Sequence, residues 1–263
     1  MIKNKIWIII LNYNCSSDTI KCLQSINKLK KKSYDLHTLI VDNASTDDSI
    51  TKINAQFPGL NLLQSPANKG YASGNNLGLK HVLKQGADYI LILNPDTIIT
   101  DPCMITKLIK TKVDITSPTI SSKKDGQITY DYGGKIDPFL GRNTHIESRS
   151  NKLHASTPDY LSGVCLFVKK KVFKKNGLFD ENYFLYYEDV DFCQRAKQNG
   201  FIIKPTRTTS LRHHLSSSTN KLGKRKLSIL AKSQLYFAKN HLPKPSTPFY
   251  YLYHLYLKIK SKI

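Results

Sequence analysis

The sequence predicts an α/β fold built on a doubly wound, mostly parallel sheet, and three observations support this prediction. The first 116 residues alternate short apolar runs with amphipathic segments, which is the pattern of strands joined by crossover helices. Clusters of Asn and Asp follow three of the apolar runs, at the strand ends where such sheets bind ligands. A length of 263 residues suits one such domain with an appendage, or two small domains.

Five apolar runs in the first half predict the strands of the sheet. They are short and rich in Ile, Leu and Val, which is typical of strands that are covered on both faces. The predicted strands are Ile6–Leu11, Leu36–Val41, Leu60–Leu63, Tyr89–Leu93 and Val113–Thr116.

The segments between these strands predict the helices. Ser16, Ser17 and Asp18 can cap a helix whose apolar face includes Ile20 and Leu23. The other predicted helices are Ser49–Phe57, Asn75–Lys84 with Gly86 behind it, and one opened by Pro102.

The second half gives weaker signals. The stretch Ser117–Ser156 is rich in Gly, Ser, Asp and Lys, and only Gln127–Tyr132 in it predicts a strand. Further predicted elements are strands at Leu161–Val168 and Phe201–Ile203, a helix at Glu188–Asn199, and a basic amphipathic helix after Gly223.

The charge is high and unevenly distributed. The net charge is +21, and the 72 residues that follow Asp191 carry 15 Lys and Arg and no acid. Such asymmetry indicates an anionic partner, which could be phosphate groups, nucleic acid or an acidic membrane leaflet. Compositional drift in a Lys- and Ile-rich proteome would produce the same numbers, so this alternative stays open.

Cysteine usage and hydropathy indicate the compartment. The five cysteines form no C-x-x-C pair and their number is odd, so we expect neither a disulfide framework nor a zinc site. The apolar run Ile6–Leu11 is too short for a signal peptide, and no stretch approaches the roughly 20 apolar residues of a membrane-spanning helix. We therefore expect a cytoplasmic protein that is soluble or peripheral to the membrane.

The candidate ligand sites are three polar clusters at strand ends, Asn12-Tyr13-Asn14, Asp42-Asn43 and Asn94-Pro95-Asp96, and the segment Asn68–Asn76. Asp42, followed by Asn43, can accept hydrogen bonds from a ribose or a base, or it can simply form a turn. In the segment Asn68–Asn76, Gly70 would allow the backbone to come close to a ligand. A helix that starts at Asn75 would offer free N–H groups to phosphate. Asn94-Pro95-Asp96 offers a ligand for Mg²⁺ or Mn²⁺, or again only a turn.

Two motifs in the second half are candidates for chemistry. Glu188-Asp189-Val190-Asp191 follows the aromatic run Tyr183–Tyr187, so it can be a general base beside an aromatic wall or an ordinary acidic helix start. His213-His214 can supply an imidazole to a metal, although most lone histidines do nothing catalytic.

Taken together and in order, six segments resemble the family 2 glycosyltransferases, in particular the bacterial branch of rhamnosyltransferases and galactofuranosyltransferases. The similarity covers roughly the first 215 residues. The segments are IIILNYN at 8–14, LIVDNASTDDS at 39–49, NKGYASGNN at 68–76, YILILNPDT at 89–97, SGVCLFVKK at 162–170 and GLFDENYFLYYEDVDFCQRAKQNG at 177–200.

The resemblance implies a GT-A fold and a role for each matching residue. The expected domain covers residues 1–220, with a nucleotide-sugar half (1–116), an acceptor half (117–220) and a basic, aromatic helical tail (221–263). The family pattern assigns Asp189 and Glu188 to the catalytic position, Asp96 and His213 to the metal, and Gly163 and Tyr187 to the acceptor. The residues that it assigns to the donor are Asn12, Tyr13, Asp42, Asn43, Gly70, Asn75, Asn94 and Asp96.

The implied reaction is an inverting sugar transfer from a nucleoside-diphosphate sugar, with rhamnose as the first expectation. Asp189 would remove a proton from the acceptor hydroxyl. A divalent cation, Mn²⁺ or Mg²⁺, would neutralise the leaving diphosphate. One departure weakens the metal site: the family's D-x-D motif has two acids, whereas Asn94 stands in the first position here.

The expected acceptor is a cell-envelope or lipid-linked glycan. Residues 221–263 hold ten Lys and Arg, with five aromatic residues between Phe249 and Tyr256, so we expect them to bind an anionic membrane surface on the inner face of the cell membrane. Packing of the tail on the domain as an ordinary basic helix pair is the alternative, and it stays open. Two other functions stay open: a sugar-nucleotide nucleotidyltransferase, disfavoured by Asn12-Tyr13-Asn14 where its phosphate loop belongs, and a nucleic-acid-binding protein, although no nucleic acid is expected.

Overall fold

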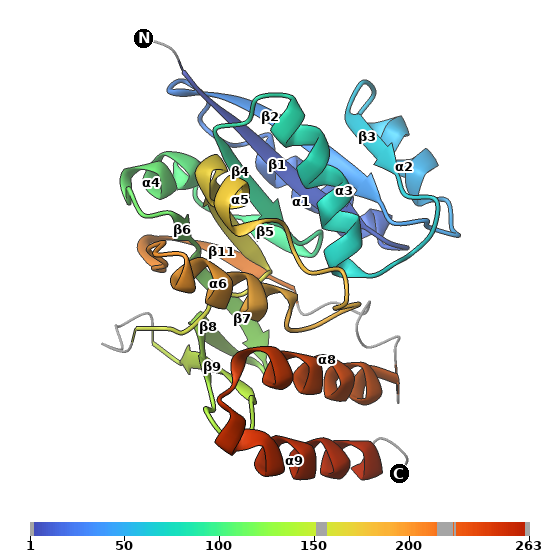
Figure 1. Ribbon diagram of the computed structural model, residues 1–263. Coiled ribbons are helices and arrows are strands. Elements are labelled where there is room, and N and C mark those ends of the chain that lie inside the picture. Colours follow the sequence, from blue (N-terminus) through green and yellow to red (C-terminus); the bar gives the residue numbers. More distant parts are fainter. Residues whose placement is uncertain (1–2, 151–156, 215–222, 224, 261–263) are drawn as a thin grey trace.

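A six-stranded sheet, here called sheet A, forms the larger part of this computed structural model, which describes residues 3–150, 157–214, 223 and 225–260 (Figure 1). The strand order is β3-β2-β1-β4-β10-β6, and the first four strands are parallel. Only β10 runs antiparallel to its neighbours, so the predicted, mostly parallel sheet is confirmed. The strands are β1 (Asn4–Asn12), β2 (Tyr34–Asp42), β3 (Asn61–Gln64), β4 (Tyr89–Leu93), β6 (Ile115–Thr116) and β10 (Cys165–Lys169).

Helices cover both faces of sheet A because side chains alternate along each strand. In β1, Ile9 packs on one face, whereas Ile8 and Ile10 pack on the other. The first face is covered by α3 (Tyr71–Lys84), α5 (Lys170–Asn176) and α6 (Glu188–Gln198). The second face is covered by α1 (Ser16–Ile26), α2 (Ser49–Gln56) and α4 (Met104–Lys110).

A second, five-stranded sheet, here called sheet B, lies on the side of sheet A away from β3 (Figure 1). Its order is β5-β11-β7-β8-β9, so it combines a short strand that follows β4 with four strands of the second half. Only β8 had been indicated by the sequence. The strands are β5 (Thr97–Ile99), β7 (Pro118–Lys124), β8 (Gln127–Ile136), β9 (Asn143–Ser148) and β11 (Thr206–His213).

The prediction that a helix starts at Asn75 is wrong, because α3 begins at Tyr71. The small residues of this segment serve close packing of the helix on sheet A. A Cβ on Gly74 would lie 2.5 Å from Leu11 Cδ1, and one on Gly78 would lie 2.9 Å from Ile9 Cγ2. The Asn75 backbone N–H is therefore inside the helix and cannot serve a phosphate in the way that was predicted.

Two other predicted boundaries are wrong. The strand expected at Leu161–Val168 begins only at Cys165, because the preceding residues form a turn that faces α6. The strand expected at Phe201–Ile203 is reduced to a single bridge between Ile203 and Ile115, since β6 is too short to pair with more of it.

The C-terminal region folds as two helices, α8 (Arg225–His241) and α9 (Thr247–Lys260), joined by the 3-10 turn Lys244–Ser246. The boundary predicted between 220 and 221 lies outside the described residues. α8 packs on the rest of the molecule: Phe237 is buried, and His241 Nε2 lies 2.7 Å from Asp191 Oδ1. Within the described ranges, no helix has both the length and the apolar character to cross a bilayer.

Candidate active site

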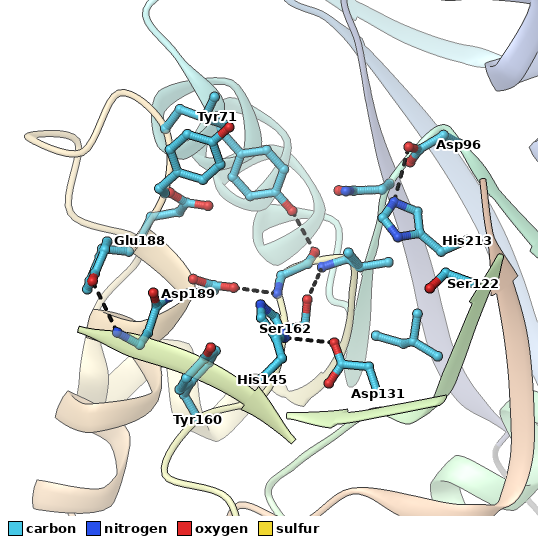
Figure 2. A pocket seen from close by; sticks show the side chains of 18 of the residues that line it. Tyr71, Asp96, Ser122, Asp131, His145, Tyr160, Ser162, Glu188, Asp189 and His213 are labelled. Atoms are coloured by element: carbon cyan, nitrogen blue, oxygen red, sulfur yellow. Dashed lines mark hydrogen bonds and ion pairs between the residues drawn. The ribbon is translucent and has the colours of Figure 1, made fainter. Parts of the chain in front are cut away.

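A cavity of about 630 Å³ lies where sheet A, sheet B and the start of α6 meet (Figure 2). Its volume is in the range of pockets that enclose small-molecule ligands. Residues predicted for the donor, the metal, the base and the acceptor come together on its walls, from four separate segments of the chain. They are Asn94, Asp96, Gly163, Tyr187, Glu188, Asp189 and His213.

Asp96 and His213 lie together at one end of the cavity. His213 Nε2 is 3.1 Å from Asp96 Oδ2. The pairing of β11 with β5 creates this contact, because His213 is in register with Thr97, the residue after Asp96. The neighbouring His214 donates its backbone N–H to Asp96 O at 2.8 Å and leaves its side chain exposed. Of the two adjacent histidines, only His213 therefore places its ring beside the carboxylate.

The donor atoms at this end suit a divalent cation. Asp96 supplies a carboxylate and His213 an imidazole. Asn94 lines the same wall, and its Oδ1 is buried without a hydrogen-bond partner in the described part of the chain. Carboxylate and amide oxygens suit Mn²⁺ and Mg²⁺, whereas imidazole favours the transition ion. The described residues include no cluster of three or more His, Cys, Asp or Glu, so phosphate oxygens would have to complete the coordination.

Asp189 lies on the opposite wall and is held by backbone groups. Its Oδ2 accepts a hydrogen bond from Gly163 N at 2.7 Å, and its Oδ1 accepts one from Val190 N at 2.8 Å. Gly163 is fixed in turn, because its carbonyl accepts a hydrogen bond from the Tyr71 hydroxyl at 2.7 Å. A Cβ on Gly163 would lie 3.2 Å from Asp189 Oδ2, so glycine permits this close approach.

Glu188 and Asp189 are adjacent carboxyl groups in different environments. Burial raises the pKa of Glu188 well above its usual range, and the charge of Asp189 adds to the effect. The Glu188 Oε2 atom has no hydrogen-bond partner among the described residues. Burial also raises the pKa of Asp189, but the backbone hydrogen bonds from Gly163 and Val190 oppose that rise. Asp189 is therefore ionised more readily than Glu188, which holds its proton more tightly.

The turn before α6 is strained and anchored. Tyr186 and Tyr187 have φ values of 68° and 70°, in the left-handed region that bulky residues rarely adopt. The Tyr187 hydroxyl fixes this conformation, because it donates to Gly141 O at 2.9 Å and accepts from Asn143 N at 3.2 Å. Tyr187 was predicted to contact the acceptor. It lines the cavity, but its hydroxyl is engaged in holding the turn that presents Glu188 and Asp189.

The residues predicted to bind the nucleotide lie at the carboxyl edge of β1 and β2, outside the cavity lining. Asn12 Nδ2 donates to Asp42 Oδ1 at 2.8 Å, and the Asn43 backbone N–H donates to Asn12 O at 2.8 Å. Asp42 also accepts hydrogen bonds from the backbone and hydroxyl of Ser45, at 2.9 Å and 2.6 Å. Tyr13, beside them, is 40% exposed and can offer its ring to a ligand.

Gly70 and Asn75 have internal contacts that the sequence did not indicate. A Cβ on Gly70 would lie 2.1 Å from the carbonyl oxygen of Phe184, so this glycine allows the loop before α6 to approach α3. Asn75 Nδ2 donates to Tyr71 O at 3.0 Å, while its buried Oδ1 has no partner among the described residues.

The cavity residues that the sequence analysis missed include Asp131 on β8, His145 on β9, and Tyr160. His145 Nδ1 lies 2.8 Å from Asp131 Oδ2. All three come from the stretch between 117 and 161, where polar and glycine residues obscure the periodicity of the strands. No motif in the sequence links Asp131 to His145, because they meet only through the pairing of β8 with β9.

Several curated proteins and many solved structures are similar to this chain. The chain is 29% identical over 202 residues to the low-salt glycan biosynthesis hexosyltransferase Agl10 of Haloferax volcanii, covering 74% of this chain and 62% of that protein. It is 28% identical over 210 residues to the N-acetylglucosaminyl-diphospho-decaprenol L-rhamnosyltransferase of Mycobacterium tuberculosis, covering 70% of this chain and 68% of that protein. The matched region thus spans about two thirds of either relative.

The fold matches glycosyltransferase structures of the GT-A type. GalNAc-T7 with UDP, GalNAc and Mn²⁺ superposes with a TM-score of 0.69 at 12% identity, over 95% of this chain and 50% of that chain. The mannosyltransferase PcManGT of Pyrobaculum calidifontis, with GDP-Man and Mn²⁺, superposes with a TM-score of 0.64 at 14% identity, over 99% of this chain and 72% of that chain. Residues 7–177 match the family described as Glycosyl transferase family 2. The chain therefore belongs to glycosyl transferase family 2 and is a glycosyltransferase with the GT-A fold.

Proposed function

We propose that the enzyme transfers rhamnose from a nucleoside-diphosphate sugar to a hydroxyl group of a lipid-linked or cell-envelope glycan, with inversion at the anomeric carbon. The observation that carries this proposal is the arrangement of the cavity. A carboxylate held by backbone hydrogen bonds, Asp189, occupies one side, and the Asp96–His213 pair occupies the other. Sugar transfer needs a base that receives the proton of the acceptor hydroxyl, and it needs groups that stabilise the leaving diphosphate. The two ends of the cavity supply these two functions.

The donor is assigned to the edge formed by β1, β2 and β4. Asp42 and Asn12 form a rigid, buried pair at the ends of their strands, and the exposed Tyr13 ring lies beside them. Parallel sheets bind nucleotides at this edge. We assign the nucleoside to Asn12, Tyr13, Asp42 and Asn43, with Gly70 and Asn75 shaping the site from α3, and the diphosphate to the wall formed by Asn94 and Asp96.

Asp96 and His213 would hold a divalent cation, with Mn²⁺ a better match than Mg²⁺ because one ligand is an imidazole. When bound, the cation would supply positive charge that stabilises the departing diphosphate. Asn94 replaces a second acid, so the protein contributes only one carboxylate at this point. The nucleotide's own phosphates would contribute much of the remaining coordination.

The bond changes are those of a single displacement. Asp189 accepts the proton of the acceptor hydroxyl as that oxygen bonds to the anomeric carbon, and the bond from this carbon to the diphosphate oxygen breaks on the opposite face. Positive charge develops on the sugar ring in the transition state. Glu188, with its raised pKa, adds a neutral carboxyl group to the same wall. Gly163 holds Asp189 from the acceptor side.

The choice of sugar and acceptor is supported by one relative. The mycobacterial enzyme is named for rhamnose and for an N-acetylglucosaminyl-diphospho-lipid. A lipid-linked acceptor agrees with the surface of α9, which exposes an apolar face next to lysines. The exposed residues of this face are Phe249, Tyr251, Leu252, Leu255, Tyr256 and Ile259. We therefore propose that the enzyme works at the inner face of the cell membrane.

A panel of nucleotide sugars tests this function. The melting temperature of the protein is measured with dTDP-rhamnose, UDP-sugars and GDP-mannose, each with and without Mn²⁺. We expect the largest rise with dTDP-rhamnose and Mn²⁺ together. Transfer to an N-acetylglucosaminyl-diphospho-lipid is then followed by NMR, which reports the anomeric configuration of the product. A larger rise in melting temperature with a UDP-sugar would mean that the donor is a UDP-sugar. Retention of the anomeric configuration would exclude the single displacement.

A further inference from the structure

Asp131 and His145 form a pair on the face of sheet B that lines the cavity. Asp131 lies on β8 and His145 on β9, and both line the cavity that contains Asp189. His145 Nδ1 lies 2.8 Å from Asp131 Oδ2. Because an ionised carboxylate can only accept a hydrogen bond, Nδ1 is the donor in this pair. The pair thereby fixes which ring nitrogen carries a hydrogen in neutral His145.

The His145 ring is held in place by Tyr160 as well. The two rings meet edge to face, with centroids 5.9 Å apart and an interplanar angle of 75°. Tyr160 is itself fixed, because its ring lies over Gly134, where an added Cβ would approach the tyrosine Cζ to 2.3 Å. The Tyr160 hydroxyl is buried and has no hydrogen-bond partner among the described residues. Carboxylate and aromatic contacts together give the imidazole one orientation.

Nε2 of His145 has no protein partner in the described part of the chain, since the only hydrogen bond of this ring is the one to Asp131. Figure 2 shows the ring between Asp131 and Asp189, with Asp96 and His213 on the far side of the cavity. The free nitrogen is therefore on the side of the cavity where the acceptor hydroxyl is expected.

The surrounding charges favour the protonated ring. Burial lowers the pKa of His145, but the hydrogen bond to Asp131 and the charges of Asp131, Asp189 and Glu147 outweigh it, so the pKa is raised. The interaction is mutual, because His145 also lowers the pKa of Asp189 against the effect of burial. Nε2 is thus well suited to donate a hydrogen bond to a sugar hydroxyl.

We propose that His145, oriented by Asp131, is an acceptor-binding residue whose Nε2 forms a hydrogen bond with the acceptor sugar, at a hydroxyl next to the one that Asp189 deprotonates. Asp131 acts as its positioning residue. This inference rests on the proposed function, and it assigns the β8–β9 face of sheet B to the acceptor. It also gives the acceptor two polar contacts, so that the reacting hydroxyl is turned toward Asp189.

The test compares acceptor and donor kinetics of His145→Ala, His145→Gln and Asp131→Asn. The acceptor is an N-acetylglucosaminyl-diphospho-lipid or the best substrate in a panel of alkyl glycosides. We expect His145→Ala to raise the acceptor KM by about tenfold or more, as the loss of one hydrogen bond predicts. We expect His145→Gln to retain part of the affinity, because its amide N–H can approach the position of Nε2. Asp131→Asn should also raise the acceptor KM.

Donor-side measurements show whether the effect is specific. Nucleoside-diphosphate affinity should stay unchanged in all three variants, because the nucleotide is assigned to residues away from the β8–β9 face. His37→Ala is the matched control: His37 Nε2 also lies 2.8 Å from a carboxylate, Asp35 Oδ2, but on β2 and outside the cavity lining. An unchanged acceptor KM in His145→Ala, or equal losses in acceptor KM and donor affinity, would overturn the inference. A wild-type enzyme that transfers sugar to no acceptor would instead overturn the proposed function.

Discussion

At the scale of single residues, the local environment decides which of two neighbouring acids can act as a base. Glu188 and Asp189 follow one another at the start of α6, but only Asp189 receives backbone hydrogen bonds on both oxygens. Glu188 is buried with one oxygen unpaired. A carboxylate that accepts hydrogen bonds loses its proton more easily than one that is only desolvated. The geometry thus favours Asp189, as the family resemblance implied.

Asp189→Asn should reduce turnover by about 10²-fold or more, because the amide cannot accept the acceptor's proton. Nucleoside-diphosphate affinity should stay within about twofold of wild type, since Asp189 is assigned to the acceptor side. Steady-state kinetics and calorimetry measure the two quantities. Glu188→Gln is the matched control and should stay active, because glutamine resembles the neutral carboxyl group. Near-normal activity in Asp189→Asn together with an inactive Glu188→Gln would assign the base to the adjacent residue.

The pH dependence of kcat/KM should carry the signature of a buried base. Asp189 must be deprotonated to act, so activity is present above its pKa and is lost as the pH falls through it. Because burial raises this pKa, the loss should begin at a higher pH than for an exposed aspartate. Glu188→Gln should leave the acid limb nearly in place, since the base that this limb reports is Asp189. An acid limb that disappears in Glu188→Gln would contradict this assignment.

Asp42→Ala should weaken nucleoside-diphosphate binding by about tenfold, even when no sugar is attached. The variant also leaves the Asn12 amide and the Ser45 backbone N–H without their acceptor, so a loss of stability of about 1–3 kcal/mol is expected. Calorimetry and thermal unfolding measure the two effects separately. Asp48→Ala, an exposed acid in the same segment that pairs with Lys52, should change neither. Unchanged affinity in a folded Asp42→Ala would remove Asp42 from the donor site.

Residue identities at the site could be predicted in large part from the ordered motifs. Asp96, His213, Gly163 and Asp189 all reach the cavity, although they are up to 117 residues apart in the chain. Their contacts could not be predicted. That Gly163 donates to Asp189, for instance, depends on a turn in front of β10 that had been interpreted as part of the strand.

At the scale of elements, the pairing of β11 with β5 builds the end of the cavity to which we assign the metal. The register places His213 opposite Thr97, and a shift of one residue would turn His213 away and present its neighbour. The sequence could not decide between His213 and His214, because β5 is only three residues long and gave no strand signal. The structure brings the ring of His213 to Asp96.

Asp96→Ala should abolish the effect of Mn²⁺ on nucleotide binding, and His213→Ala should weaken it, because each change removes one proposed ligand. Calorimetric titration of a nucleoside diphosphate with and without Mn²⁺ provides the measurement. His214→Ala is the matched control, since only its backbone contacts Asp96, and it should behave as wild type. Full transfer activity in EDTA would reject a metal role for both residues.

The glycines in the first half of α3 show how a packing requirement can resemble a ligand loop. Gly74 and Gly78 both face β1 and β2, where a side chain would collide with Leu11 or Ile9. Small residues at a spacing of four are equally compatible with a loop and with one face of a helix. The choice depends on how closely α3 approaches sheet A, which is a tertiary property. The predicted helix was therefore correct in kind but four residues too short at its start.

At the scale of the whole molecule, the candidate active site lies at the junction of two sheets, and only one of these sheets could be predicted. Sheet A consists largely of apolar runs that are buried on both faces. β7 to β9 of sheet B are half exposed and contain Lys, Ser, Thr and Gly, so neither composition nor alternation distinguished them from loops. The acceptor side of the cavity, with Asp131 and His145, was missed for this reason.

The two C-terminal helices differ in burial: α8 packs on the rest of the molecule, and α9 lies at its surface. α8 packs on the catalytic part through Phe237 and the pair formed by His241 and Asp191. α9 lies on the outer side of α8 and buries only Tyr250 and Leu257. Figure 1 shows both helices beside sheet B, on the side of the molecule away from β3. Packing accounts for α8, whereas the outer face of α9 remains open to a partner.

The open face of α9 should bind anionic membranes. Leu252 is 67% exposed, Ile259 is 56% exposed, and Lys258 and Lys260 lie in the same last turns. Exposed apolar side chains insert into the interface, and each nearby lysine adds roughly 1 kcal/mol at an anionic surface. We expect the protein to co-sediment with vesicles that contain anionic lipid and to be released by salt.

Replacing Leu252, Leu255 and Ile259 together by Ser tests this surface without removing the buried contacts of α9. We expect vesicle binding to fall by about tenfold or more, because three exposed apolar side chains leave the interface, while the melting temperature and nucleotide affinity stay unchanged. Ile202→Ser is the matched control, since Ile202 is 61% exposed at a site remote from α9 in sequence, and it should bind as wild type. A lowered melting temperature in the triple variant would instead mean that the outer face of α9 supports the fold. Equal binding of the wild type to neutral and anionic vesicles would contradict the role of the lysines, because neutral lipid offers them no attraction.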